Sequence, residues 1–535
     1  MKSIKHISYI LTFILVGACE QEVLKLQDPC DVDPESCIIK PVCEGATAGT
    51  AEFTKFVAIG NSFVAGVQAG ALFTGGQNNS IAAILNKQFE CVGAPAAFIQ
   101  PTIGASLGWN LFVTQPFLTD NTKPILGRLL LQYNGSTSPK PTPQAYAPGN
   151  LEALPNPAAN PGFIYTGGKA TLNNFGVPAI VLGQALIPET GAWAGAGVDP
   201  RFSPFYGRFA PPPGGTTTII GDAAAAGGSF FLFWLGLDDF FLHAAFGGDP
   251  TKAPLTSAPA FGAIYGAAIG ALLSSNPNLK GVVGNFPNIF AMPHFTAVAW
   301  NALPLDAATA AALTASLANN YNAFLDGMVA LTVIDADEAA LRKITYTESK
   351  NNAILINDET LTDLSAYMAG PYAGLLPYAI ARQTKSTDIL PLAAGSVIGT
   401  AIGGDPTKVN GVSVPLADQY ALIPSEIAAI NDARTAFNAT VKAVADANPS
   451  RLAHADINAA LNAFVTARAA VYNGVTITPK IDPPTGIYSE DGVHPNSRGY
   501  AFLSRVFIDA INTTFTAKIP LTDISKYGAT GLPIP

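Results

Sequence analysis

Charge is scarce in this chain. Charged residues make up 13% of its 535 residues, against roughly 25% in an ordinary soluble domain. The 29 Lys and Arg residues are scattered without a basic run, and the formal net charge is -9. A surface that follows nucleic-acid phosphates needs clustered positive charge, so the composition argues against nucleic acid as a partner.

Cysteine is scarce too, with five residues at positions 19, 30, 37, 43 and 91. No two of them have C-x-x-C spacing and no histidine lies near them, so we expect no zinc or other metal site. Cys19 belongs to the N-terminal signal described next. The remaining Cys30, Cys37, Cys43 and Cys91 predict one or two disulfides near the start of the folded chain, with three pairings open.

The N-terminus has the order of a signal peptide. Lys2 and Lys5 precede the largely apolar run 7–16, and small residues follow it. The stretch Val16-Gly17-Ala18-Cys19 resembles a bacterial lipobox, which implies that residues 1–18 are removed and that Cys19 carries lipid. We therefore expect an exported protein anchored to the bacterial outer membrane, on its periplasmic or cell-surface face. The alternative is a short hydrophobic segment that is simply cleaved off or retained.

Strand and helix patterns alternate after an acidic, Pro-rich stretch. We assign residues 19–50 to the lipidated cysteine and a linker, 51–520 to one folded domain and 521–535 to a C-terminal tail. Alternation predicts an α/β sheet, with long surface loops at 132–163 and 203–215. The predicted strands are Thr54–Ile59, Ala179–Leu182, Phe230–Leu235, Gly281–Val283 and Ala353–Ile356, and the predicted helices include 304–330, 424–447 and 456–472.

The segment Ala253–Ser274 is uncharged and carries Gly262, Gly266 and Gly270 at four-residue spacing. That spacing lets transmembrane helices approach each other closely. A helix packed on a soluble sheet uses small residues for the same reason, and the segment is weakly apolar for a membrane span. We expect a soluble helix packed on the sheet.

One serine and one histidine have the context of a catalytic pair. A serine hydroxyl needs an imidazole base, and the base needs a carboxylate that orients it. Ser62 follows the first strand at a predicted turn into a helix, and Asp491 and His494 share one short loop. In the alternative, Ser62 is only a helix cap and His494 only a loop residue. His243, His294 and His454 lack such context, so we expect them to be structural.

Two segments resemble the SGNH (GDSL-like) hydrolase family. Residues 58–66, AIGNSFVAG, are similar to the family's first block, and Asp491-Gly492-Val493-His494-Pro495 with the trailing Gly499-Tyr500 is similar to its last. The resemblance implies a three-layer α/β/α flavodoxin-like sandwich with a mainly parallel sheet and helical insertions. It also implies a catalytic triad of Ser62, Asp491 and His494, with no cofactor.

The same resemblance implies an oxyanion hole made by the backbone N–H groups of Ser62 and Gly176 and by the side chain at position 238. The family has Asn at that last position, where this chain has Asp238. An ionised carboxylate cannot donate a hydrogen bond. Three outcomes are open: slow catalysis on the backbone donors, a protonated Asp238 that donates, or binding without turnover. Asn285 follows the next strand and is not expected to replace the missing amide.

Together these observations predict an exported, lipid-anchored serine esterase or lipase that cleaves acyl esters through an acyl-serine intermediate. Its expected partners are the membrane and an acyl-ester or lipid substrate, with an acetylated glycan as a second substrate class. The alternative is a degenerate hydrolase fold that acts as a binding or assembly subunit beside another outer-membrane protein.

Overall fold

The computed structural model describes residues 40–111, 126–133, 135, 138–145, 164–210 and 213–532. Residues from Pro41 onward form one compact unit. Its centre is a sheet of five parallel strands in the order β15-β8-β7-β1-β6, so the strands follow the order 2-1-3-4-5 when numbered along the chain. They are β1 (Phe56–Gly60), β6 (Asn174–Gly176), β7 (Phe230–Trp234), β8 (Lys280–Gly284) and β15 (Leu452–Ala455).

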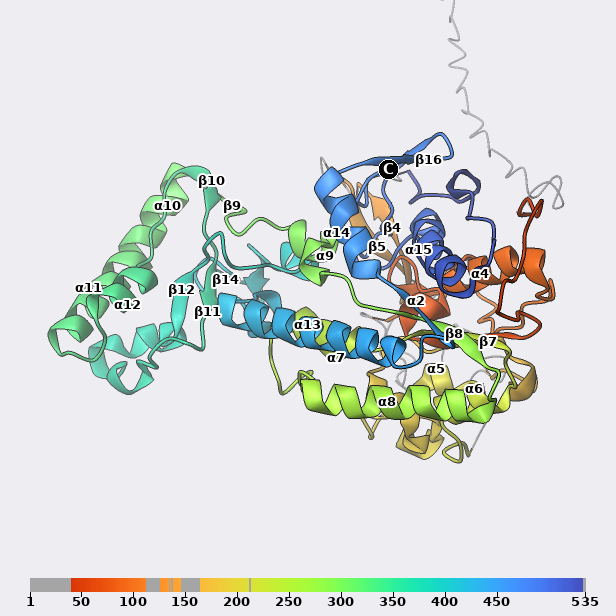
Figure 1. The fold of residues 1–535 in the computed structure, drawn as a ribbon. Helices are drawn as coiled ribbons and strands as arrows, with labels where there is room; N and C mark the ends of the chain where they lie inside the picture. Colours follow the sequence, from red (N-terminus) through yellow and green to blue (C-terminus); the bar gives the residue numbers. More distant parts are fainter. Residues whose placement is uncertain are drawn as a thin grey trace, which may run out of the picture. The chain divides into compact units, whose positions relative to one another are not determined.

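Helices cover both faces of this sheet, as the alternating side chains of β7 show. Trp234 packs on Phe507 of α15 (Ser497–Phe515), whereas the next side chain back, Phe233, packs on Tyr265 of α8 (Ala258–Ser275). Neighbouring residues of a strand point to opposite faces. Helix α4 (Ile81–Phe89) lies beside α15, and α6 (Ile219–Ala225) and α13 (Pro424–Asp446) lie beside α8 (Figure 1).

The remaining elements are short. The helices are α2 (Ser62–Ala65), α3 (Thr74–Asn78), α5 (Pro204–Gly207), α7 (Asp238–Ala245), α9 (Pro293–Thr296) and α14 (Ile457–Ala467). The antiparallel strand pairs are β2 (Ala71–Leu72) with β3 (Trp109–Asn110), β4 (Leu126–Gln132) with β5 (Lys140–Ala145), and β16 (Ala470–Tyr472) with β17 (Val475–Ile477).

Three of the predicted strands are central: Thr54–Ile59 overlaps β1, Phe230–Leu235 overlaps β7 and Gly281–Val283 lies in β8. The prediction of Ala179–Leu182 was wrong, because the strand lies earlier at β6 and the chain turns after Pro178. The predicted strand Ala353–Ile356 does not belong to the central sheet. Its residues join β11 (Leu355–Asn357), which pairs antiparallel with β12 (Ala381–Gln383) outside the central sheet.

A large insertion separates β8 from α13. It contains α10 (Ala307–Leu313), a π-helical turn (Thr314–Ala318), α11 (Asn319–Ala330) and α12 (Ala336–Arg342). Its strand pairs are β9 (Leu303–Leu305) with β10 (Ser349–Asn352), β11 with β12, and β13 (Ala401–Ile402) with β14 (Asp405–Val409). Two hydrophobic clusters of its own stabilise it, and buried Arg382 pairs with Asp358 and Asp388. The insertion is therefore a packed substructure.

Judged by length and composition alone, helix α8 could cross a membrane, and a third of its residues are buried. Its inner side, including Phe261, Tyr265 and Ile269, packs against the unit. A Cβ added at Gly266 or Gly270 would meet nothing within 4 Å. Gly266 and Gly270 therefore lie on the outer side, whereas a Cβ at Gly262 would lie 3.8 Å from Thr440 of α13. The helix packs on the sheet as expected, but Gly266 and Gly270 do not make that packing closer.

Both predicted flanking segments contact the folded unit. In the predicted linker, Thr47 exchanges backbone hydrogen bonds with Lys518, and Cys43 forms a disulfide with Cys91. In the predicted tail, Thr522 is buried and its hydroxyl lies 2.6 Å from that of Ser504. Cys19, Cys30 and Cys37 lie outside the described residues.

Candidate active site

Ser62 lies where β1 ends and α2 begins. A Cβ at Gly60 would lie 2.5 Å from the carbonyl oxygen of Trp234, so the turn leaves room only for glycine. Asn61 caps the helix, because its Oδ1 accepts a hydrogen bond of 3.1 Å from the N–H of Phe63. Ser62 is thereby the first residue of a helix, where backbone N–H groups lack intrahelical acceptors.

The three predicted catalytic side chains lie in one hydrogen-bonded line. His494 Nε2 is 2.8 Å from Ser62 Oγ, and His494 Nδ1 is 2.8 Å from Asp491 Oδ2. All three residues are at least 95% buried. Ser62 and His494 are 432 positions apart in the sequence, so only the folded chain brings the nucleophile to its base. The line has the order that nucleophilic serine catalysis requires.

The loop that carries Asp491 and His494 is held from several directions. Asp491 Oδ1 accepts the backbone N–H groups of Val493 and His494, each at 2.8 Å. Ser489 Oγ donates to the carbonyl of His494 at 2.9 Å and accepts the N–H of Ala69 at 2.8 Å. Burial alone would raise the pKa of Asp491, but His494 and these N–H donors lower it below 3.8. Asp491 is therefore ionised and can orient the imidazole.

Asp238 begins α7, directly after β7, and lines the same pocket as Ser62. Asn61 Nδ2 donates to Asp238 Oδ2. The orientation of that amide follows from the helix cap, since Asn61 Oδ1 already accepts from Phe63. Burial raises the pKa of Asp238 from 3.8 to about 6, although Asn61 and the charge of His494 lower it. A proton bound there would sit on Oδ1, since Oδ2 is occupied as an acceptor.

Gly176 is not placed as predicted. Its backbone N–H donates to Asn174 Oδ1 at 2.9 Å, and the residue is absent from the lining of the pocket. Ala179, three residues later, does line the pocket and has a positive φ of 54°, which is uncommon for a residue with a side chain. Its N–H makes no hydrogen bond within the described chain. Ala179 is thus a candidate backbone donor at the pocket, and its positive φ was not readable from the sequence.

Asn285 does not contribute an amide to the pocket. Its Nδ2 donates to Asp456 Oδ1 at 2.8 Å and its Oδ1 accepts the N–H of Asn458 at 2.9 Å. It therefore joins the loop after β8 to the start of α14, in agreement with the expectation that it does not replace the missing family Asn.

The other histidines differ from one another. His243 is buried with Nδ1 2.7 Å from the carbonyl oxygen of Ala253, and His454 lies in β15; neither lines the pocket. His294 does line it, with Nδ1 3.3 Å from the carbonyl oxygen of Asp491. Its backbone N–H donates to the carbonyl of Gly492 at 3.0 Å. Burial lowers the pKa of His294, so it is neutral near pH 7. His294 thus both lines the pocket and supports the loop that carries Asp491 and His494.

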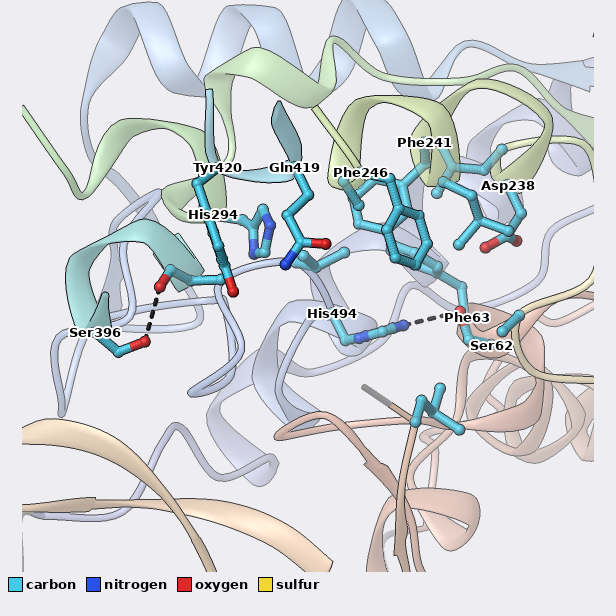
Figure 2. A pocket seen from close by; sticks show the side chains of 17 residues that line it. Ser62, Phe63, Asp238, Phe241, Phe246, His294, Ser396, Gln419, Tyr420 and His494 are labelled. Atoms are coloured by element: carbon cyan, nitrogen blue, oxygen red, sulfur yellow. Dashed lines mark hydrogen bonds between the residues drawn. The ribbon is translucent and has the colours of Figure 1, made fainter. Parts of the chain in front are cut away.

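The pocket around Ser62 has a volume of about 570 Å³, within the range of small-molecule sites. Its walls come from α7, from the triad loop and from the insertion, which contributes Ser396, Gln419 and Tyr420 (Figure 2). The insertion was not recognised from the sequence as part of the site, because its pocket residues lie more than 330 positions after Ser62 and share no motif with it.

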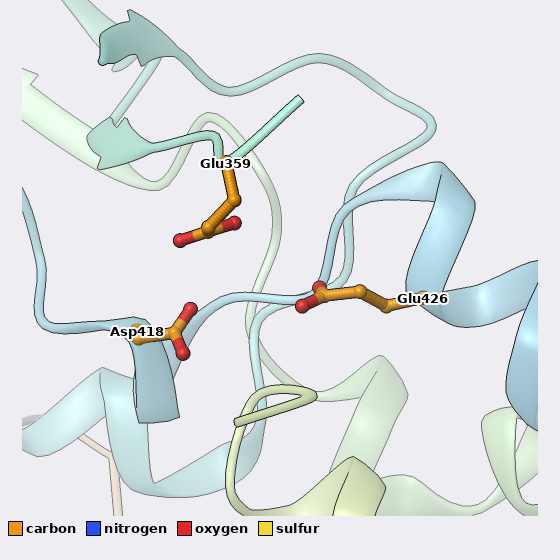
Figure 3. A group of neighbouring side chains, drawn as sticks. All are labelled: Glu359, Asp418 and Glu426. Carbon is orange, nitrogen blue, oxygen red and sulfur yellow. The ribbon is translucent and has the colours of Figure 1, made fainter. Parts of the chain in front are cut away.

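Three carboxylates gather where the insertion meets the first turn of α13. Oxygens of Glu359, Asp418 and Glu426 all lie within 4.8 Å of one another (Figure 3). Burial, with the charges of neighbouring carboxylates, raises the pKa of Asp418 to about 7 and that of Glu426 to about 8. Asp418 immediately precedes Gln419 and Tyr420, two residues that line the pocket, whereas none of the three acids lines it.

Comparison with known proteins adds no relative. No protein-family model matches the chain, and neither a curated protein nor a solved structure matches it. The assignment of a function therefore depends on the residues of the site and on their geometry.

Proposed function

We propose that this protein is a serine ester hydrolase of the SGNH type. The observation that carries the proposal is the continuous line from Ser62 through His494 to Asp491, with both hydrogen bonds at 2.8 Å. A serine used only as a helix cap has no need of a buried imidazole and an ionised carboxylate behind it.

In the proposed reaction, Ser62 Oγ attacks the ester carbonyl carbon while His494 takes the hydroxyl proton. The carbon–oxygen bond to the alcohol then breaks, and His494 gives that proton to the leaving oxygen. A water molecule next attacks acyl-Ser62 with His494 again as the base, which releases the carboxylic acid and restores Ser62. Asp491 stabilises the imidazolium that forms in each step.

The developing oxyanion needs donors on the other side of Ser62. The N–H of Ser62, in the first turn of α2, and the N–H of Ala179 are backbone candidates. A protonated Asp238 is the third, because a neutral carboxylic acid can donate where a carboxylate cannot. With a pKa of about 6, Asp238 is mostly ionised at pH 7, so we expect slow turnover at neutral pH.

The order of the central strands supports the family assignment. A sheet with the order 2-1-3-4-5 has the flavodoxin-like arrangement, and such sheets bind ligands where the order reverses. Here the reversal lies between β1 and β7, the strands that lead into Ser62 and Asp238. Export and lipid anchoring through Cys19 to the outer membrane belong to the same proposal, and they depend on the N-terminal motif alone.

The test is covalent labelling of the nucleophile. The full chain is treated with a fluorescent fluorophosphonate and assayed with p-nitrophenyl esters, beside the Ser62→Ala variant. We expect labelling and ester cleavage by the wild type and neither by the variant. A wild-type protein that takes no label and cleaves no ester would contradict the proposal.

Asp238, the ionisable group at the proposed oxyanion position, favours a second function, that of a binding protein without turnover. Asp238 places negative charge where an esterase needs a donor, as expected if the fold has lost catalysis and serves as a binding or assembly subunit at the outer membrane. Asp238→Asn separates the two: stronger labelling of the variant than of the wild type supports a hydrolase site, whereas no labelling in either protein supports the binding role.

A further inference from the structure

One face of α7 forms an apolar wall of the pocket. The helix has eight residues, so it runs for about 12 Å. Leu237, Phe241, Leu242, Ala245 and Phe246 recur at the spacing of one helix face, and all line the pocket. The opposite face packs inward, where Phe240 contacts Phe286 and Phe437. Phe246 is 39% exposed at the end of the helix, so the apolar wall continues to the surface.

The other side of the pocket is polar. Figure 2 shows His294, Gln419, Tyr420 and Ser396 on the side of His494 away from Ser62, and Phe241 and Asp238 on the side of Ser62. Phe246, at the far end of α7, lies between these two groups and next to Gln419. Within the described chain, neither the side-chain amide of Gln419 nor the hydroxyl of Tyr420 makes a hydrogen bond. These two groups point into the pocket and can bind hydroxyl groups of a ligand.

The chemistry of acyl transfer decides which half takes which part of an ester. The histidine gives its proton to the leaving alcohol oxygen, so the alcohol lies on the imidazole side. The carbonyl oxygen points to the oxyanion donors, and the acyl chain is bonded to the carbonyl carbon away from the leaving oxygen, so it leads away from the imidazole. In this pocket the imidazole side is the polar one, and the side of Asp238 continues into the apolar face of α7.

We infer that the substrate is an amphiphilic ester: an acyl chain of about eight carbons or more lies along α7, and an alcohol with free hydroxyl groups lies against Gln419 and His294. The inference rests on the proposed function and narrows it, since it excludes short acetyl esters and esters of plain alkyl alcohols as preferred substrates.

The acyl half is tested with p-nitrophenyl butyrate and octanoate. Four buried methylenes, at about fourfold each, raise kcat/KM for octanoate about 250-fold over butyrate. Ala245→Phe places a ring in the space beside the apolar wall, and we expect it to reduce the octanoate-to-butyrate ratio of kcat/KM about tenfold or more. The matched control Ala267→Phe places the same ring on the exposed side of α8 and should keep the wild-type ratio.

The alcohol half is tested with 1-octanoylglycerol and ethyl octanoate, which share one acyl chain. We expect the wild type to prefer the glycerol ester, and Gln419→Ala to reduce that preference about two- to tenfold, as for one lost hydrogen bond. Fluorophosphonate labelling of Ser62 is measured in every variant. Two results from a labelled enzyme overturn the inference but not the proposed function. One is a kcat/KM for octanoate that does not exceed that for butyrate. The other is equal cleavage of 1-octanoylglycerol and ethyl octanoate by both the wild type and Gln419→Ala. A wild type that takes no label overturns the proposed function and the inference with it.

Discussion

Replacing Asp238 by Asn should stabilise this protein in a pH-dependent way. Burial raises the pKa of Asp238 from its ordinary 3.8 to about 6 in the folded chain. Between these two values the folded state binds more protons than the unfolded state, so stability is lost as the pH rises from about 4 through 6. At about 1.4 kcal/mol for each pKa unit, the ionised group costs about 3 kcal/mol above pH 7. The amide removes this cost and still accepts from Asn61.

The assay is thermal unfolding of wild type and Asp238→Asn at matched scan rates between pH 4 and pH 8.5. We expect equal midpoints near pH 4, a gap that opens between pH 4 and 6, and a constant gap above pH 7 with the variant more stable. A gap that does not change with pH, or a variant less stable at pH 8, would show that Asp238 is not a strained buried acid.

The same variant should turn over esters faster, because an amide donates to the oxyanion at every pH. One such donor is worth about 10²–10³ in kcat, so at pH 8 we expect a gain approaching that range. At pH 5, where Asp238 carries a proton of its own, the gain shrinks to a few-fold. The ratio of the two enzymes is the informative quantity, since the pH dependence that both enzymes share cancels in it.

Asp239→Asn is the matched control. Burial raises the pKa of Asp239 to about 7, but its oxygens accept from Leu182 N–H and Thr256 Oγ1 and do not line the pocket. The charges of Asp238 and Asp239 repel each other, so the turnover ratio of Asp239→Asn to wild type should vary between pH 5 and 8 far less than that of Asp238→Asn, but not be constant. If Asp238→Asn lowers kcat at pH 8, Asp238 is not a defective oxyanion donor.

Four further predictions follow from other parts of the structure. Asp491→Asn keeps the fold but leaves His494 in the wrong tautomer, so kcat for p-nitrophenyl butyrate should fall about 10⁴-fold; a loss below tenfold would argue against the triad. Ala179→Gly relieves the φ of 54° and keeps the N–H, so thermal unfolding should show a gain of up to about 1 kcal/mol with kcat maintained; a destabilised variant would contradict this. Replacing Cys43 and Cys91 by Ser removes a disulfide between residues 48 positions apart, and urea unfolding should show a free energy of unfolding lower by up to about 4 kcal/mol. An unchanged free energy of unfolding would show that the N-terminal segment does not stabilise the fold. Glu426→Gln removes an acid whose pKa is raised to about 8; wild-type stability should decline from pH 5 to 8 more steeply than that of the variant, and parallel pH profiles would refute the assignment.

The predictable parts of this protein are those with strong local signals. The strand before Ser62 and those at β7 and β8 are runs of apolar, often β-branched or aromatic residues, and periodicity marks them. Strand β15 reads Leu-Ala-His-Ala, which has no β-branched residue, so it was missed. The pairing of Ser62 with Asp491 and His494 was predictable because each lies in a motif. Ala179 and Gln419 were not, since a positive φ and a pocket wall supplied by an insertion depend on tertiary structure.

Helix α7 connects the catalytic question with the question of substrate. Its first residue is Asp238, which lines the pocket with Ser62, and the same face continues through Phe241 and Ala245 along the pocket. The apolar surroundings that suit an acyl chain are also what raises the pKa of Asp238, because burial is the largest cause of that shift. An acyl chain bound on this wall would exclude water further and favour the protonated, donating form. Substrates with long chains should therefore show less loss of kcat between pH 6 and 8 than butyrate does. If both show the same loss, the acyl wall and the acid act independently.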